Sequence, residues 1–142
     1  MISLTQNATR YISKLSNKLR RKFDMLSSRK EFSGSQGRTL RFLLSQTEDI
    51  YQKDIEEEYS IRPSTATQLL KQMEKNGLII REPEAYDNRL KKIVVTDKAL
   101  LYKQQVIEDL TTLEETLIKG ISETDLQVFF RVTEKMMDNL SE

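Results

Sequence analysis

The sequence predicts a mainly α-helical protein that contains one small β-hairpin, and three observations carry this prediction. Only 4 Gly and 2 Pro occur among 142 residues, whereas the helix-favouring residues Leu, Lys, Glu and Gln are common. Apolar residues recur at every third or fourth position over most of the chain, which is the period of an amphipathic helix. Two short aliphatic runs, residues 78–80 and 93–95, depart from this period and flank a turn-rich stretch, as the strands of a hairpin do.

Length and composition also limit what the protein can do. A chain of 142 residues can bury a core as one domain. It contains no Cys and no His, which excludes disulfides, thiolate nucleophiles, Ser–His triads and imidazole-ligated metals. The longest apolar run, residues 99–102, is too short for a membrane span or a signal peptide. We therefore expect a cytoplasmic protein that is not an enzyme and uses no metal or cofactor.

Four helices are expected before the hairpin. Apolar spacing predicts a long first helix over residues 4–26. Ser33 and Gln36 form the pattern of a capping box, with Ser33 as N-cap and Gln36 at N3 of the second helix. A short acidic helix is expected at roughly residues 51–59. Pro63 suits the first position of the fourth helix, which should end at residues 76–77 with glycine after its last turn.

Two helices are expected after the hairpin, whose tip should be a long polar turn over residues 83–89. Thr96 should cap a long helix over residues 97–120, and Ser122 with Asp125 a final helix. The helix after Thr96 carries one apolar stripe at Leu100, Ile107, Leu110, Leu117 and Ile121 and a second at Ala99, Val106 and Leu113. So broad a surface needs partners, which the terminal helices of two chains would supply in a homodimer. A bundle of these helices within one chain is the alternative.

The net charge of +1 averages over strong local charges. Residues 1–47 have a net charge of +8, and residues 60–100 of +3. Residues 48–59 and residues 101–142 each have a net charge of −5. The near-neutral total therefore conceals a basic front half and an acidic end, each with a strong local field.

The helix that starts at Pro63 has a face suited to reading a DNA groove. Its apolar positions 66, 69, 70 and 73 share one side. Glutamine bonds adenine, threonine methyl groups contact thymine, and hydroxyls and lysines bind phosphates. Amides, hydroxyls and lysines of this kind lie on the side opposite the apolar positions, at Ser64, Gln68, Lys71 and Lys75, flanked by Thr65, Thr67 and Gln72. An ordinary solvated amphipathic helix is the alternative interpretation.

The hairpin follows that helix at once, and this order predicts a winged helix-turn-helix. Arg89 near the hairpin tip suits the narrow minor groove. Asp87, two residues earlier, can orient the guanidinium by a charge-assisted bond. A polar turn with a weak surface ion pair is the alternative. Helix and hairpin together predict sequence-specific DNA binding, with Arg89 in the minor groove and with major-groove contacts from Ser64, Thr65, Thr67, Gln68 and Lys71.

A longer residue pattern joins these parts. It reads Gln36-x-x-x-Leu40, then Ser64-x-x-Thr67-x-x-Leu70-x-x-Met73-Glu74-x-x-Gly77-Leu78-Ile79-x-Arg81, then Asp87-x-Arg89 and Val95-Thr96. The pattern resembles the MarR family of bacterial transcription regulators, and the resemblance includes the helical extensions at both ends. Met73 stands where that family usually has Leu, and Val95 and Ala99 replace its usual Leu and Gly.

The resemblance implies an obligate homodimer on a pseudo-palindromic operator, usually repressing and often released by a small ligand. We expect one domain over residues 1–142, with a DNA-binding lobe at 33–96 and helical dimerisation regions at 1–30 and 97–142. Because Cys and His are absent, sensing by cysteine oxidation and a His-rich zinc site are excluded, which leaves an organic or anionic effector or no effector at all. No sequence signature identifies the effector residues. A winged-helix module that binds protein or RNA without an operator is the alternative function.

Overall fold

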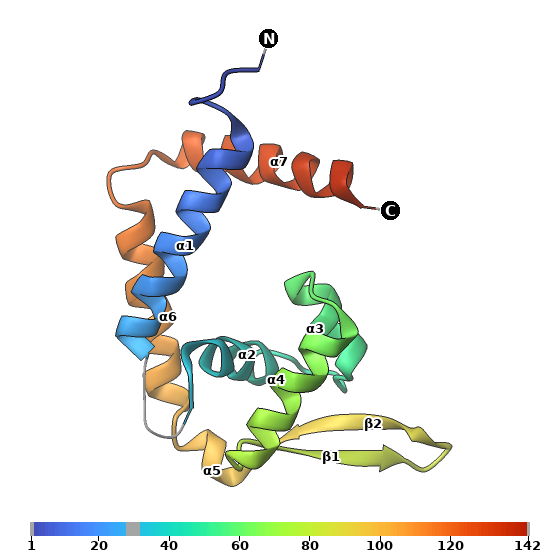
Figure 1. Ribbon diagram of the computed structural model, residues 1–142. Coiled ribbons are helices and arrows are strands. Elements are labelled where there is room, and N and C mark those ends of the chain that lie inside the picture. Colours follow the sequence, from blue (N-terminus) through green and yellow to red (C-terminus); the bar gives the residue numbers. More distant parts are fainter. Residues whose placement is uncertain (1, 28–31, 142) are drawn as a thin grey trace.

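The computed structural model describes residues 2–27 and 32–141 and confirms the expected fold class (Figure 1). The described elements are helices joined by short turns and one antiparallel hairpin. Residues 28–30, part of the expected N-terminal dimerisation region, lie outside the described residues, as do residues 1, 31 and 142. In chain order the elements are α1 (Ala8–Ser27), α2 (Gly34–Leu44), α3 (Gln52–Tyr59), α4 (Pro63–Lys75), β1 (Ile79–Glu84), β2 (Asp87–Val95), α5 (Asp97–Leu100), α6 (Lys103–Ile118) and α7 (Glu123–Leu140).

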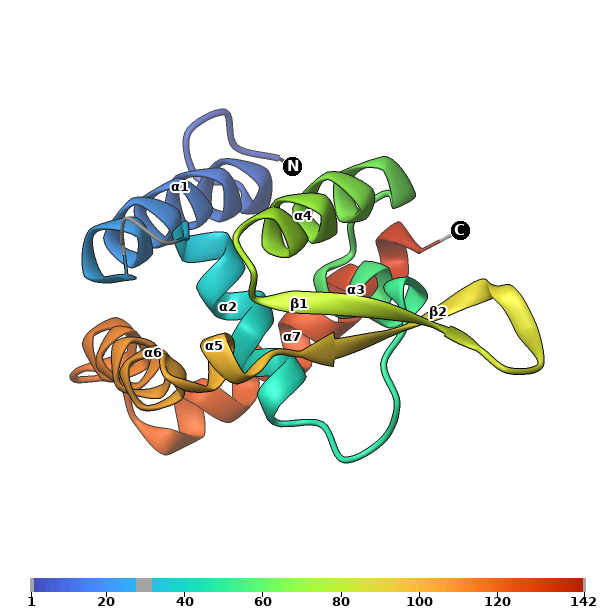
Figure 2. The ribbon, with the colours of Figure 1, turned by 90° about the horizontal axis from the view of Figure 1, so that it is seen from below.

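The elements form two parts. Helices α1 and α6 pack side by side, and α7 follows α6 at the end of the molecule that holds both chain termini (Figure 1). Helices α2, α3 and α4 and the hairpin form the other part, and α2 packs against both α1 and α6. Seen from below, the hairpin projects away from the helices (Figure 2). No helix among the described residues is both long enough and apolar enough to cross a membrane.

A single apolar core holds the second part together. The predicted inner face of α4 is confirmed, because Ala66, Leu70 and Met73 are fully buried and Leu69 is half-buried. Burying a large aliphatic side chain contributes about 1.5–3 kcal/mol, so this face fixes α4 to the lobe. Around it the core is completed by Phe32, Leu40, Leu43, Ile50, Ile55, Leu78, Ile79, Ile93, Ala99 and Val106.

The predicted helix ends are confirmed where local chemistry determines them. The side chains of Ser33, Thr96 and Ser122 each accept a hydrogen bond from a backbone N–H in the first turn that follows. Pro63 occupies the first position of α4, where its missing N–H costs nothing. Gly77 has φ +74° just beyond α4, a conformation that glycine adopts without strain.

Two expectations for the N-terminal half are wrong in detail. The first helix begins at Ala8, because Asn7 Oδ1 accepts a hydrogen bond from the backbone N–H of Arg10 at 2.9 Å and caps it there. Leu4 therefore lies outside the helix and is exposed. Only half of the expected capping box forms at α2, since Gln36 Oε1 instead accepts from Asn76 Nδ2 at 2.8 Å. That bond ties α2 to the end of α4.

The expected long hairpin tip is also wrong. The strands pair from Ile79 with Val95 up to Glu84 with Asp87, with a register shift next to Pro83. Only residues 85–86 remain as the turn. An irregular ladder at the exposed end accommodates a proline, which has no N–H to donate. Asp87 and Arg89 consequently lie on a strand rather than on a loop.

The expected continuous helix after Thr96 is interrupted. The backbone N–H groups of Leu101 and Tyr102 bond three residues back, to Lys98 O and Ala99 O, which tightens the turn between α5 and α6. The Tyr102 ring packs edge-on against Phe32 with centroids 5.0 Å apart. This packing anchors the turn on the core, and α6 continues in a new direction (Figure 1).

Candidate nucleic-acid interface

Four of the predicted major-groove residues lie free on the outer side of α4. Ser64, Thr65, Gln68 and Lys71 are all exposed, opposite the buried face of the helix. A hydroxyl pair, an amide and an ammonium group are therefore presented together, without a carboxylate among them. This set offers donors and acceptors for base edges and phosphates.

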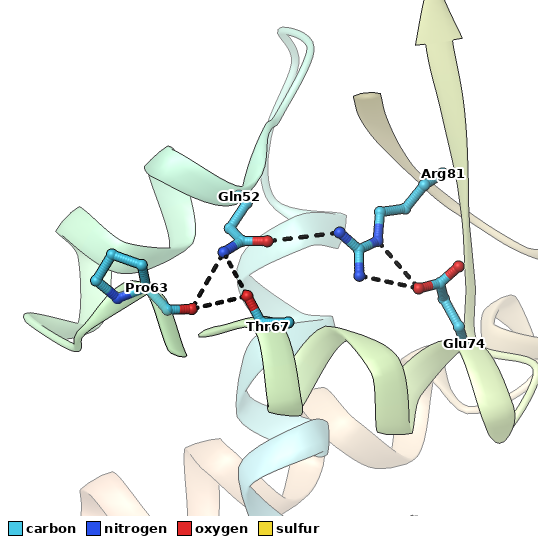
Figure 3. Close-up of polar contacts among 5 residues, drawn as sticks. All are labelled: Gln52, Pro63, Thr67, Glu74 and Arg81. Carbon is cyan, nitrogen blue, oxygen red and sulfur yellow. Dashed lines mark hydrogen bonds and ion pairs between the residues drawn. The ribbon is translucent and has the colours of Figure 1, made fainter. Parts of the chain in front are cut away.

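Thr67 differs from these four. It is half-buried, and its hydroxyl donates to Pro63 O at 2.9 Å while accepting from Gln52 Nε2 at 3.0 Å (Figure 3). The hydroxyl is thus engaged within the protein, and its methyl group is the part left for contacts. The sequence pattern alone did not separate Thr67 from its neighbours.

The wing pair forms as the sequence predicts. Asp87 Oδ1 accepts from the backbone N–H of Arg89 at 2.9 Å and from its Nε at 3.4 Å. The Arg89 side chain is 93% exposed, so the pair adds at most about 1 kcal/mol to stability. Its effect is on direction: the carboxylate biases where the guanidinium points.

Contacts with the loop before α3 hold the hairpin in place. Ile93 N donates to Ile50 O at 2.8 Å, and the Tyr51 hydroxyl donates to Glu84 Oε1 at 2.6 Å. The hydrogen bond to the Glu84 carboxylate raises the pKa of the Tyr51 hydroxyl. The hairpin therefore has a defined direction relative to α4.

Two residues that the sequence reading did not assign to the site connect these parts. Arg81 of β1 places both Nε and Nη2 at 3.0 Å from Glu74 Oε1 and offsets the one acidic group on this side of α4 (Figure 3). Gln52 of α3 lies between Arg81 and Thr67 (Figure 3). Arg81 belongs to the family pattern quoted above, but Gln52 carried no signal because its partners are far away in sequence.

A cavity lies where the two parts of the molecule meet. It has a volume of about 460 Å³ and lies between α1, α2 and α6. The Arg38 guanidinium carbon is 5.6 Å from the centroid of the Phe23 ring and 5.8 Å from that of Tyr59, so it joins α1 to α3. Among the described residues the lining comprises Ser16, Leu19, Arg20, Phe23, Asp24, Ser33, Ser35, Arg38 and Leu113.

Comparison with known proteins supports this description. Residues 33–91 match the sequence model of the MarR family, and no curated protein sequence matches significantly. The transcription regulator MarR from Oenococcus oeni PSU-1 is 24% identical with a TM-score of 0.81, over 93% of this chain and 99% of that one. MepR of S. aureus, solved as a DNA complex, is 24% identical with a TM-score of 0.85, over 95% and 99%.

PcaV from Streptomyces coelicolor, solved with its natural ligand, is 16% identical with a TM-score of 0.85, over 99% of both chains. At these identities the structural likeness establishes the fold, here over almost the whole chain. The matched residues 33–91 contain α2, α3, α4, β1 and the first part of β2, which belong to the winged helix-turn-helix. By this sequence match, residues 33–91 carry the pattern of the MarR family, and the chain as a whole has the fold of solved MarR-family transcription regulators.

Proposed function

We propose that the protein is a homodimeric repressor that binds a pseudo-palindromic operator. The observation that carries this proposal is the exposed row of Ser64, Thr65, Gln68 and Lys71 on α4, beside a braced hairpin that presents Arg89. Helix α4 reads the major groove and the wing enters the minor groove. MepR, with the same fold, was solved on DNA.

The homodimer is supported by the two apolar stripes after Thr96. Ala99, Val106 and Leu113 are buried within the chain, which accounts for one stripe. The other stripe stays exposed, at Leu100, Ile107, Leu117 and Ile121. None of the described residues of α7 is buried, although it carries Phe129 and Phe130.

A second copy of the chain is the occupant that fits this surface. Helix α1 is strongly basic, whereas the segment from residue 101 onward has a net charge of −5. Opposite charges on helices with unpartnered apolar faces favour pairing between two chains. A two-fold dimer places two α4 helices about one DNA turn apart.

The test of DNA binding compares two substitutions on α4. Lys71→Ala should weaken binding to every duplex and reduce the salt slope by about 0.9, because one phosphate contact is lost. Gln68→Ala should relax sequence preference at one base pair by about 1–3 kcal/mol, with the salt slope unchanged. Gel-shift titrations at two salt concentrations, with a selected and an unrelated duplex, measure both effects.

Lys103→Ala is the matched control, since Lys103 is an exposed lysine at the start of α6, outside the proposed interface. It should leave both affinities unchanged. Salt-independent or absent duplex binding by the wild type would contradict the proposal and favour a protein- or RNA-binding module. The exposed row of polar side chains and the MepR–DNA complex favour DNA.

A small organic anion is the effector that the cavity between α1, α2 and α6 fits best. Arg20 and Arg38 outnumber the one lining carboxylate, Asp24, and Leu19 and Phe23 provide an apolar surface. PcaV was solved with its natural ligand. Binding there would act on Arg38 and through it on Tyr59 of α3.

Arg38→Gln should weaken binding of such a ligand about tenfold, because a charge-assisted bond is lost. The measurement is ligand-induced release from duplex DNA together with the shift in Tm, over a panel of aromatic and aliphatic carboxylates. Arg41→Gln is the control, since Arg41 lies on the same helix but does not line this cavity. An unchanged response in Arg38→Gln would place the effector elsewhere.

A further inference from the structure

One glutamine links the three elements of the candidate interface. The Gln52 side chain extends from the first residue of α3 (Figure 3). Its Nε2 donates to Pro63 O at 3.2 Å and to Thr67 Oγ1 at 3.0 Å, both in α4. Its Oε1 accepts from Nη1 of Arg81 in the wing at 3.4 Å. Both ends of the amide are therefore used between elements.

Arg81 holds α4 at a second point. Its bonds to Glu74 Oε1 are both 3.0 Å long, and its side chain is only 18% exposed, so solvent weakens this pair less than a surface pair. Thr67 and Glu74 are seven residues apart, or two turns, and therefore lie on the same side of α4, about 10 Å apart along its axis. Two contacts on one side, two turns apart, fix the rotation of the helix about its own axis.

That rotation determines where the exposed side chains point. Gln68 directly follows the held residue Thr67 and Lys71 lies one turn further on, so each turns with the helix. A bidentate bond to a base tolerates little angular error, whereas a lysine finds a phosphate from many directions. Loss of the contacts should thus affect discrimination between sequences far more than attachment to DNA.

We propose that Gln52 is a positioning residue for sequence discrimination: it sets the rotation of α4 by linking Thr67 to Arg81 of the wing. This inference rests on the proposed function. Gln52 is uncharged, so its role is separable from phosphate binding by the salt dependence. Loss of its hydrogen bonds to Pro63, Thr67 and Arg81 is expected to reduce the discrimination between DNA sequences about tenfold.

The experiment measures Gln52→Ala against the wild type on two duplexes, one selected by the wild type from a library randomised over roughly 30 base pairs, or three turns, and one of unrelated sequence. Affinity for the selected duplex should fall about tenfold, while affinity for the unrelated duplex and the salt slope stay as in the wild type. Arg81→Lys, which keeps the charge but not the planar fork, should act in the same direction. The double variant should lose no more affinity for the selected duplex than the weaker-binding single variant does, since both substitutions act through the orientation of α4.

Gln104→Ala is the matched control. Gln104 makes the same kind of contact within its helix, Nε2 to Glu108 Oε1 at 3.0 Å, as Gln52 makes to Glu56 at 3.2 Å. It should bind both duplexes as the wild type does, and an unchanged Tm in each variant shows that folding is intact.

The outcomes separate the two proposals. A wild type that prefers no sequence overturns the proposed function and this inference together. A wild type that discriminates, with Gln52→Ala discriminating equally well, overturns the inference alone. An equal loss on both duplexes, or a changed salt slope, also overturns it, because it assigns Gln52 to the fold or to a phosphate contact.

Discussion

Phe129→Asp is expected to separate the proposed homodimer into single chains that no longer retain an operator duplex. Phe129 is half-exposed on α7, and its ring packs edge-on against Phe130 at 5.8 Å between centroids. In the proposed dimer this surface would be covered, and an unpaired carboxylate there would cost several kcal/mol. A single chain has one α4 helix, and without the second the affinity should fall by at least about 100-fold. Size-exclusion chromatography with light scattering should then give a mass near 16.6 kDa instead of twice that value.

Gln127→Asp provides the control for this substitution. Gln127 is an exposed polar residue of α7 that bonds only locally, to Glu123 Oε1 at 3.0 Å. It introduces the same charge on the same helix and should leave the mass and DNA affinity of the wild type. A Phe129→Asp variant that remains a dimer would show that α7 is not part of the interface between the chains.

Arg89→Ala is expected to weaken operator binding about 10- to 100-fold. The Arg89 side chain extends from β2 into solvent and is oriented by Asp87. A guanidinium that enters a narrow minor groove gains from the enhanced negative potential there, and truncation removes this gain. Fluorescence anisotropy with a labelled operator duplex measures the loss, and A·T-rich sequences at the flank should show the largest effect.

Lys91→Ala is the control for the wing. Lys91 is exposed on the same strand and carries the same charge, so its removal should reduce affinity only as one phosphate contact does. If Arg89→Ala binds the operator as tightly as the wild type, the assignment of the wing to the minor groove is wrong.

Features that depend on neighbouring residues were predictable from the sequence. The caps at Ser33, Thr96 and Ser122, and Pro63 at the start of α4, follow from the backbone chemistry of a few adjacent positions. The buried face of α4 follows from apolar spacing alone. The exposed residues proposed for base contacts were predicted because they lie on the side of α4 opposite this buried face.

Features that depend on contacts between distant residues were not predictable. The break between α5 and α6 is accompanied by packing of Tyr102 on Phe32, far back in the chain. Gln52 could not be assigned a role, because Thr67 and Arg81 come near it only in the folded lobe. The wing tip was placed wrongly because turn-forming residues there pair in a ladder despite Pro83. A single sequence shows composition and the spacing of apolar residues, but not these contacts between distant residues.

The two apolar stripes that run along α6 have a consequence for the geometry of the proposed dimer. Val106 and Leu113 are buried, whereas Ile107 and Leu117 are exposed and would contact the second chain in the proposed dimer. Helix α6, with 16 residues and a length of about 24 Å, would thus contact both the DNA-binding lobe of its own chain and the second chain. In the proposed dimer, the length of α6 would contribute to the separation of the two α4 helices. Insertion of one residue within α6 would turn the later part of both stripes by about 100° relative to their earlier part, so a change in the length of this helix keeps both faces aligned only when it adds whole turns.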